Sequence, residues 1–406
     1  MIDTNSPLRR SRYEERLAPF IGTSLIKVIT GQRRVGKSCF LRSTRDRLAA
    51  AHPGTPILFV DKEAAGWGGM NSAEDLLAEA ARIAGSGSCI ILIDEVQEIR
   101  DFERALRSLA GEGRFDLYVT GSNAGLLSGE IATLFAGRAV TIAIHPLTYD
   151  EFLVFHDRPD EDASLALYLR YGGLPFLKHL PLRDDTVSGY LRGVYDTAVL
   201  KDVVGRHGIR APDLLERLAL FIADNVGSPC SARSISRFLK SQAVDSSVPT
   251  LLDYLARLRE AYLLNRTRRA DLVGKRFMEV GEKYYFEDLG LRAAIRGFRD
   301  EDIGKVVENA VYLRLLADGW DVSHGALGDR EIDFVCDRAG ERLYVQAAYV
   351  LADAATRDRE FGNLLAVPDN YPKAVVSMDP IVSDFRGVRH VRLREFLKNG
   401  FRPGAG

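Results

Sequence analysis

The sequence predicts an α/β protein with several domains. A phosphate-binding domain with a parallel sheet comes first, a helical and winged-helix region follows, and a small α/β domain comes last. Three patterns predict this fold class: a strand, glycine loop and helix near the N-terminus; two amphipathic helices followed by strand-like runs; and a helix followed by three strand-like runs near the end. The 406 residues exceed one typical core. We expect domains at 1–150, 151–226, 227–300 and 301–406.

Composition and charge are those of an ordinary globular chain, with 46% hydrophobic and 27% charged residues. The net charge of −1 gives no general attraction to nucleic acid, so any such surface must be local. The four cysteines are far apart and form no pair of zinc-binding spacing. The polar N-terminus is not a secretory signal, and no apolar run approaches the roughly 20 residues that span a bilayer. We therefore expect a cytoplasmic protein with no membrane partner.

A phosphate-binding loop is predicted between the buried strand "SLIKVIT" and the helix "CFLRSTRDRLAAA". The loop "GQRRVGKS" matches G-x-x-x-x-G-K-[ST] in the strand–loop–helix context that this motif requires. Its glycines let the backbone approach phosphates, and the helix N-terminus adds N–H donors. Lys37 can reach the β- and γ-phosphates, and Ser38 can bind Mg²⁺. The predicted ATP-binding residues are Gly31, Gln32, Arg33, Arg34, Val35, Gly36, Lys37, Ser38 and Cys39.

Two acidic residues follow another buried strand in "CIILIDEVQEI". A buried parallel strand delivers its last residues to the edge where ligands bind in open α/β sheets. Asp94 is therefore expected to hold Mg²⁺ together with Ser38, and Glu95 to act as the general base on the attacking water.

Two further residues are candidates near the phosphates. The strand "DLYVTGSN" ends in Ser122 and Asn123, which can contact the γ-phosphate or water. The alternative is an ordinary turn or helix cap, because Ser and Asn are favoured in both. Arg138, before another strand, can serve as a finger on a neighbouring subunit's γ-phosphate, or it is a surface arginine in a salt bridge. The finger role would require a homo-oligomer.

Several motifs in order resemble a large prokaryotic family of AAA-type P-loop ATPases whose C-terminal half carries a domain of unknown function. They are "GQRRVGKS", "IILIDEVQ", "VTGSN", "AGR" followed by "HPLTYDEF", and "YGGLPF". The resemblance covers nearly the whole chain. It implies a five-stranded parallel AAA-like sheet and nothing definite about the substrate.

The middle of the chain predicts a winged helix-turn-helix. "SARSISRFLKS" and "SSVPTLLDYLARLREAYLL" are helical in pattern, and "LLNRTRR" and "KYYFED" follow as strands. Residues 231–280 hold ten Lys or Arg and five Asp or Glu, a local excess suited to phosphate contacts. Winged helices also serve as protein-binding modules. If duplex DNA is the partner, the residues expected to matter are Arg257, Arg259, Arg268, Arg269, Lys275 and Arg276.

The C-terminal part predicts the order α-β-β-β-α-β, with "DRAG" as the turn of a β-hairpin. This order resembles the PD-(D/E)XK nuclease-like fold. In active members, a helix glutamate and a strand aspartate bind Mg²⁺, and an acid or glutamine two residues before a lysine completes the site. The matching residues are Glu308, Asp333 and Gln346, but Ala348 stands where the lysine should be.

Without that lysine the C-terminal domain is expected to be a scaffold or a surface for a protein partner. Arg342 or Arg357 could take over the missing role. Three hypotheses follow for the whole chain: a nucleotide-dependent switch that hydrolyses ATP, an ATP-regulated nuclease, and a nucleotide-binding adaptor with little hydrolysis. Glu95 favours the first over the third, and Ala348 argues against the second.

Overall fold

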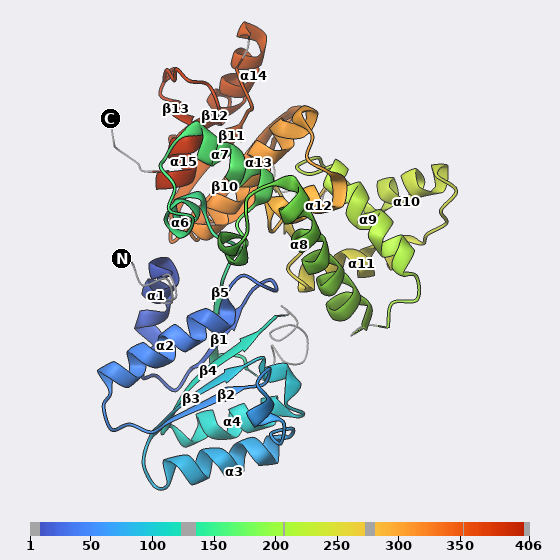
Figure 1. Cartoon of the computed structure of the whole chain (residues 1–406). Coiled ribbons are helices and arrows are strands. Elements are labelled where there is room, and N and C mark those ends of the chain that lie inside the picture. Colours follow the sequence, from blue (N-terminus) through green and yellow to red (C-terminus); the bar gives the residue numbers. More distant parts are fainter. Residues whose placement is uncertain (1–8, 123–134, 206–207, 273–280, 352, 402–406) are drawn as a thin grey trace. The chain divides into compact units, whose positions relative to one another are not determined.

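The computed structural model describes residues 9–122, 135–205, 208–272, 281–351 and 353–401. The chain divides into two compact units (Figure 1). Unit 1 contains residues 1–145 and 260–262, and unit 2 contains residues 146–259 and 263–406. This division into two units does not test the four domains that the sequence predicts, which stay a prediction. Within the described residues, no helix combines the length and apolar character needed to cross a bilayer.

Unit 1 is built on a five-stranded parallel sheet with the strand order β2-β3-β4-β1-β5, which confirms the parallel sheet expected from the sequence. The strands β1 and β3 are buried along their whole length, as expected of strands covered on both faces. The strands are β1 (Ile26–Thr30), β2 (Ile57–Asp61), β3 (Cys89–Asp94), β4 (Phe115–Gly121) and β5 (Ala139–Ala143).

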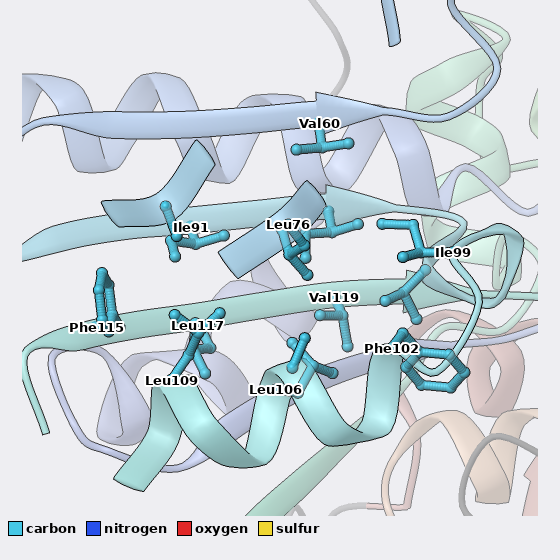
Figure 2. Packing of buried hydrophobic residues seen from close by; sticks show 14 of the residues in the cluster. Val60, Leu76, Ile91, Ile99, Phe102, Leu106, Leu109, Phe115, Leu117 and Val119 are labelled. Carbon is cyan, nitrogen blue, oxygen red and sulfur yellow. The ribbon is translucent and has the colours of Figure 1, made fainter. Parts of the chain in front are cut away.

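Helices α3 and α4 cover one face of this sheet, and α2 covers the other (Figure 1). Leu106 and Leu109 of α4 pack against Leu117 and Val119 of β4 (Figure 2). Burying a leucine side chain contributes roughly 1.5–3 kcal/mol, so this layer alone stabilises unit 1 substantially. The helical elements are α1 (Ser11–Leu17), η1 (Ala18–Phe20), α2 (Lys37–Ala51), η2 (Ala65–Trp67), α3 (Ala73–Ala84), η3 (Val96–Glu98) and α4 (Phe102–Glu112).

Unit 2 begins with helices, as the sequence predicts for this region. The first are α6 (Tyr149–Phe155), α7 (Asp162–Tyr171), η5 (Pro175–His179), α8 (Asp184–Asp196), η6 (Thr197–Gly205) and α9 (Pro212–Asp224). They are followed by α10 (Ala232–Ser241), α11 (Val248–Glu260), α12 (Leu289–Arg296) and η7 (Asp300–Asp302).

The "YGG" of the family motif forms a close junction inside unit 2. Gly173 N donates to Asp288 Oδ2 at 2.7 Å. Gly172 has a φ of +77°, and a Cβ there would lie 2.5 Å from Asp288 Oδ1. A Cβ on Gly290 would lie 2.0 Å from the carbonyl oxygen of Tyr171. Only glycine permits this approach, so the motif joins α7 to α12.

The predicted wing strands form a small antiparallel sheet, in which β6 (Leu264–Thr267) pairs with β8 (Lys283–Phe286). Between them, β7 (Arg269–Asp271) leaves this pair and adds a parallel edge to the C-terminal sheet, next to β9 (Asp321–Leu327). The segment between the wing strands is therefore hydrogen-bonded to the C-terminal part of the chain.

The C-terminal sheet has six strands in the order β13-β12-β11-β10-β9-β7. Its elements include α13 (Ile303–Ala317), β9, β10 (Arg330–Arg338), β11 (Glu341–Ala347), α14 (Ala354–Leu365) and β12 (Lys373–Ser377), in the predicted order. β13 (Arg389–Arg392) and α15 (Leu393–Asn399) complete it. The predicted hairpin is confirmed: β10 and β11 are antiparallel, and Ala339 and Gly340 at the turn both have positive φ, as tight hairpin turns require.

Candidate nucleotide-binding site

The predicted phosphate-binding loop follows β1 and leads into α2. Gly31 has a φ of +146°, and a Cβ there would lie 2.2 Å from the carbonyl oxygen of Ile144, so no other residue fits. Gly36 has a φ of +97° and precedes the first turn of α2, which no side chain of the described chain caps. The N–H groups of this 15-residue helix are therefore directed at a ligand position.

Lys37 is the first residue of α2 and is almost fully buried. Its Nζ donates to the carbonyl oxygens of Gly31 and Gln32, both at 3.0 Å. These two peptide oxygens carry no formal charge, and the bonds to them orient the ammonium. The structure thus places the lysine against the loop that it is predicted to serve.

The other predicted loop residues differ in exposure. Gln32 and Val35 are buried, Arg33 and Ser38 are half-buried, and Arg34 and Cys39 are exposed. Arg34 has a φ of +69°, a left-handed conformation that is uncommon outside glycine. The loop therefore presents a buried inner side and an arginine-bearing outer side.

The acidic pair lies where the sequence predicts it, at the C-terminal end of β3. Asp94 is the last residue of the strand, and Thr120 of the neighbouring strand β4 donates its hydroxyl to Asp94 Oδ1. The backbone N–H of Glu95 donates to the same Thr120 oxygen at 2.9 Å. Glu95 has a φ of +52°, and Gln97 Nε2 donates to its Oε2. Thr120 and Gln97, which the sequence analysis did not single out, thus fix both acids.

Burial raises the pKa of Asp94, and the nearby charges of Glu95 and Asp61 act in the same direction. Hydrogen bonds from Thr120 and Ser38 oppose this rise. Asp61 ends β2 and is the direct neighbour of Asp94 in the sheet. The fold therefore holds a carboxylate in a place where its charge is costly.

Several buried polar atoms at this edge have no hydrogen-bond partner of ordinary length in the described part of the chain. They are both side-chain amide atoms of Gln32, Asp94 Oδ2, Ser122 Oγ and Thr30 Oγ1. Their residues lie in or next to the C-terminal ends of β3, β4 and β1, which are adjacent and parallel. Because buried polar groups are rarely left unpaired, these atoms indicate a ligand. A carboxylate oxygen beside hydroxyl and amide groups fits a magnesium-bound polyphosphate.

Arg10 supports the loop from outside and was missed from sequence. It is buried just before α1, with Nη1 donating to the Val35 oxygen at 3.3 Å and Nη2 to the His145 oxygen at 3.0 Å. Its guanidinium also lies over the Tyr13 ring. Nothing in the sequence marks Arg10 among the other arginines near the N-terminus, because its partners come from distant segments.

The remaining candidates of this domain stay predictions. Asn123 lies outside the described residues, directly after the buried Ser122. Arg138 is exposed, and its carbonyl oxygen accepts from the N–H of Ile26 at the start of β1. The phosphate loop follows the other end of that strand, about 15 Å away at the usual rise per residue. Arg138 is therefore distant from the site of its own chain, and two readings stay open: a finger on a neighbouring subunit, or an ordinary surface arginine.

The candidates of the C-terminal layer come together, with one addition. Glu308 of α13 and Asp333 of β10 both contact the ammonium of Lys283, from β8. Gln346 lies beside Asp333, and its side-chain oxygen accepts from the Asp333 backbone N–H. Among the described residues, no group of three or more His, Cys, Asp or Glu could hold a metal ion.

The arginines expected to replace the missing lysine of this layer are elsewhere. Arg342 makes a two-pronged ion pair with Asp337 on the neighbouring strand. Arg357 stacks over the rings of Phe361 and Phe385. That expectation was wrong, because the cation at the acids comes from Lys283.

Of the predicted DNA-contacting residues, Arg257 and Arg259 lie on α11, and Arg268 and Arg269 follow β6. Arg257 is half-buried and pairs with Asp253 at 3.2 Å, whereas Arg268 is exposed. Burial lowers the pKa of Arg259, and the nearby charge of Arg266, followed by that of Arg268, lowers it further. Arg269 begins β7, and Lys275 and Arg276 lie outside the described residues.

Comparisons with known proteins agree with this picture of unit 1. Residues 23–153 match a family described as "AAA domain", and residues 162–302 match the family "Domain of unknown function (DUF8612)". An uncharacterized protein of Haemophilus influenzae is 34% identical over 379 residues, which cover 91% of this chain and 93% of that protein. An uncharacterized protein of Methanocaldococcus jannaschii is 28% identical over 355 residues, covering 82% and 77%.

Similar solved structures include the Aeropyrum pernix Orc1 protein in complex with DNA, with a TM-score of 0.34, 14% identity and coverage of 72% of this chain and 94% of that one. The AMPPCP-bound DnaA from Aquifex aeolicus has a TM-score of 0.29, 14% identity and coverage of 64% and 89%. Scores this low establish no shared function. The Haemophilus influenzae protein is similar over nearly its whole length, and the chain therefore belongs to its family, in which an AAA domain precedes a domain of unknown function.

Proposed function

We propose that the chain binds ATP with Mg²⁺ at its phosphate-binding loop, hydrolyses it, and acts as a nucleotide-dependent switch. The observation that carries this proposal is the set of buried, unpartnered polar atoms beside Asp94 and Glu95. Without an acid placed to activate the attacking water, the same sheet edge would fit equally well an adaptor that binds ATP and hydrolyses little of it. Glu95, buried and held by Gln97, is what favours hydrolysis.

Each residue of the edge has a separate task. The N–H groups at the start of α2 and the ammonium of Lys37 would bind the β- and γ-phosphates. Ser38 and Asp94 would hold Mg²⁺, which supplies charge neutralisation at the phosphate oxygens. Thr120 keeps Asp94 and Glu95 in one arrangement, because its hydroxyl oxygen bonds to both residues.

Glu95 is the residue that can take a proton from water. Gln97 fixes its carboxylate through Oε2, which leaves Oε1 to accept the hydrogen bond of the attacking water. A general base contributes about 10²–10⁴-fold to such a reaction. Removing this base should therefore lower the rate by a similar factor.

Steady-state phosphate release from the full chain tests hydrolysis. We expect Lys37→Ala to abolish turnover, and Glu95→Gln to reduce it by about 10²-fold or more while ATP still binds. Glu98→Gln is the matched control, since it makes the same change at an exposed position three residues on, and it should retain the wild-type rate. Tight ATP binding with no turnover in the wild type, alone or with duplex DNA, would instead establish the adaptor.

The trans finger has its own test, which also reports on self-association. If Arg138 acts on a neighbouring subunit, the specific rate should rise with protein concentration, and Arg138→Ala should remove that rise. A specific rate that is independent of concentration would contradict both the finger and the homo-oligomer that it requires.

A second candidate function is duplex DNA binding by a winged helix formed by α10, α11 and the β6–β8 pair. The excess of Lys and Arg over Asp and Glu in residues 231–280 supports it, because grouped cationic side chains attract the phosphates of a duplex. A protein partner for the C-terminal layer also remains a prediction.

Duplex binding should be measured as a function of salt concentration. Replacing Arg257 and Arg268 together by Glu should weaken binding and reduce the salt dependence by about two phosphate contacts. Arg45→Glu, at a half-buried arginine on α2, is the control. Equal binding by all three proteins would exclude this surface.

A further inference from the structure

Lys283 is a buried lysine on β8 around which three carboxylates converge. Its side chain is only 2% exposed, and its Nζ lies 3.3 Å from Glu308 Oε1 and 3.7 Å from Asp333 Oδ1. It also pairs with Glu331 Oε1. The four side chains come from β8, α13 and β10. Three carboxylates around one point need a cation, and here the protein provides it.

Other protein groups also donate to carboxylate oxygen atoms of this cluster. Tyr285 donates its hydroxyl to Glu308 Oε1 at 2.7 Å, and the N–H of Ala347 donates to Asp333 Oδ2 at 2.9 Å. In the described part of the chain, no buried atom of Lys283, Glu308 or Asp333 lacks a partner. The cluster is therefore satisfied without a ligand.

The backbone also closes the cluster. Gly227 has a φ of +72°, and a Cβ there would lie 2.5–2.6 Å from the carboxyl group of Glu308. The backbone at Gly227 therefore packs directly against the carboxyl group of Glu308. The Glu308 and Asp333 side chains are 17% and 14% exposed, which leaves little access for a hydrated ion.

The charges support a stable ammonium at this position. Burial alone would lower the pKa of Lys283, but Glu308, Asp333 and Glu331 outweigh it and raise the pKa above its ordinary value. Burial, followed by the charge of Glu308, raises the pKa of Asp333, and the ammonium of Lys283 opposes this rise. The lysine thus stays charged and the acids compete for one cation.

We propose that the Lys283 ammonium is the permanent counter-ion of these carboxylates, and that it excludes divalent cations and makes the C-terminal layer a non-catalytic scaffold. It also joins β8 to α13 and β10, as the pairing of β7 with β9 joins the segment between the wing strands to the same sheet. Two sets of contacts therefore connect this region to the C-terminal sheet: the ion pairs of Lys283 and the pairing of β7 with β9. This inference concerns a different cluster from the phosphate-binding loop and does not depend on ATP hydrolysis.

Thermal unfolding of the nucleotide-free full chain, with and without Mn²⁺, tests the proposal. The Tm of the wild type should not respond to Mn²⁺. Lys283→Met leaves the carboxylates without a cation, so its Tm should fall by at least about 5 °C and should be raised again by Mn²⁺. In Lys283→Met with Asp333→Asn, the response to Mn²⁺ should disappear.

Lys27→Met is the matched control, because Lys27 is also buried and paired with a carboxylate, Asp116, in the other unit. Its Tm should fall without any response to Mn²⁺. A Lys283→Met protein that folds but ignores Mn²⁺ would overturn the proposal.

If Lys283→Met does not fold, the wild type still decides the question. Any saturable heat in an Mn²⁺ titration should be unchanged by Asp333→Asn, and plasmid DNA should not be nicked in the presence of Mn²⁺. Saturable binding or nicking that Asp333→Asn abolishes would show that the layer accepts metal despite Lys283, and would overturn the proposal.

Discussion

Two buried lysines, Lys37 in unit 1 and Lys283 in unit 2, show how partners decide what a charge can do. Lys37 donates to two peptide oxygens, which orient the ammonium but carry no formal charge. Lys283 meets three carboxylates, which neutralise it. The first arrangement fits the proposed contact with phosphate. In the second, the charge is used within the protein.

The polar atoms around each lysine differ in the same way. Near Lys37, Gln32 and Asp94 have buried atoms that no described residue satisfies. Near Lys283, a tyrosine hydroxyl donates to Glu308 and a backbone N–H donates to Asp333. Unsatisfied buried atoms cost free energy unless a ligand binds, so the first site is built for a ligand and the second for stability.

Removing each lysine should give opposite results, and this is the largest effect we expect. Lys37→Ala should weaken ATP binding by about 100-fold or more and change the free energy of unfolding little, because it removes a phosphate contact. Lys283→Met should destabilise the chain by about 3–5 kcal/mol yet leave ATP affinity unchanged. Fluorescent-ATP titration and denaturant unfolding of both variants measure this. Equal effects of both variants in both assays would remove the distinction.

Two glycines provide a second comparison. Gly227→Ala should lower the free energy of unfolding by about 2 kcal/mol or more, since the new carbon meets Glu308 at a left-handed φ. Gly31→Ala meets the Ile144 oxygen and should distort the phosphate loop, so its main effect should be on ATP affinity. Gly54→Ala, where a Cβ meets nothing within 4 Å despite its φ of +93°, controls for backbone strain alone. A loss at Gly227 no larger than the loss at Gly54 would contradict the close packing.

The buried carboxylate of Asp288 differs from the other two groups, because its hydrogen-bond donors are the backbone N–H groups of Gly173 and Leu291. Burial still raises its pKa to about 6. The folded state therefore keeps the proton to a higher pH than the unfolded state does. The stability from this group is full below about pH 4, is lost as the pH rises towards 6, and amounts to about 3 kcal/mol at most.

Asp288→Asn cannot titrate, so its free energy of unfolding should fall less between pH 4 and 6 than that of the wild type. Denaturant unfolding at several pH values measures this slope. Asp46→Asn, at an exposed position, should keep the wild-type slope. Identical slopes for Asp288→Asn and the wild type would show that backbone donors remove the cost of burial entirely.

The sequence predicted what is local and missed what is brought together over long distances. The phosphate loop, the parallel strands and the "DRAG" hairpin depend on neighbouring residues, and the structure contains them. Lys283 was missed because its partner Glu308 is 25 residues away and Asp333 lies farther still. The strand containing Lys283 was assigned to the wing, and only the packed structure shows that its side chain reaches another layer.

The same reason explains the two residues that support the nucleotide site. Thr120 lies within the quoted "VTGSN", but its role depends on β4 lying beside β3, which the sequence does not reveal. Arg10 contacts Val35 and His145, which are 25 and 135 residues away. Arg342 and Arg357 were considered because they are close to Ala348 in sequence, and proximity in sequence proved a poor guide.

The smallest effect we expect concerns the free energy that is lost by burying the charged Asp94 carboxylate at the nucleotide site. Because burial raises the pKa of Asp94, Asp94→Asn should raise the free energy of unfolding of the nucleotide-free chain by about 1 kcal/mol while weakening ATP binding in the presence of Mg²⁺. Asp61→Asn, at the neighbouring sheet position, should do the opposite to stability, because it breaks the ion pair with Arg42.

Denaturant unfolding and ATP titration of the two variants check this prediction. If Asp94→Asn raises the free energy of unfolding and Asp61→Asn does not, the destabilising effect of a buried charge is specific to the predicted magnesium ligand. It is then not a general property of acids at this edge of the sheet. A loss at Asp94 would mean that its bonds to Thr120 and Ser38 outweigh burial, and the site would then resemble the Lys283 cluster in being satisfied without a ligand.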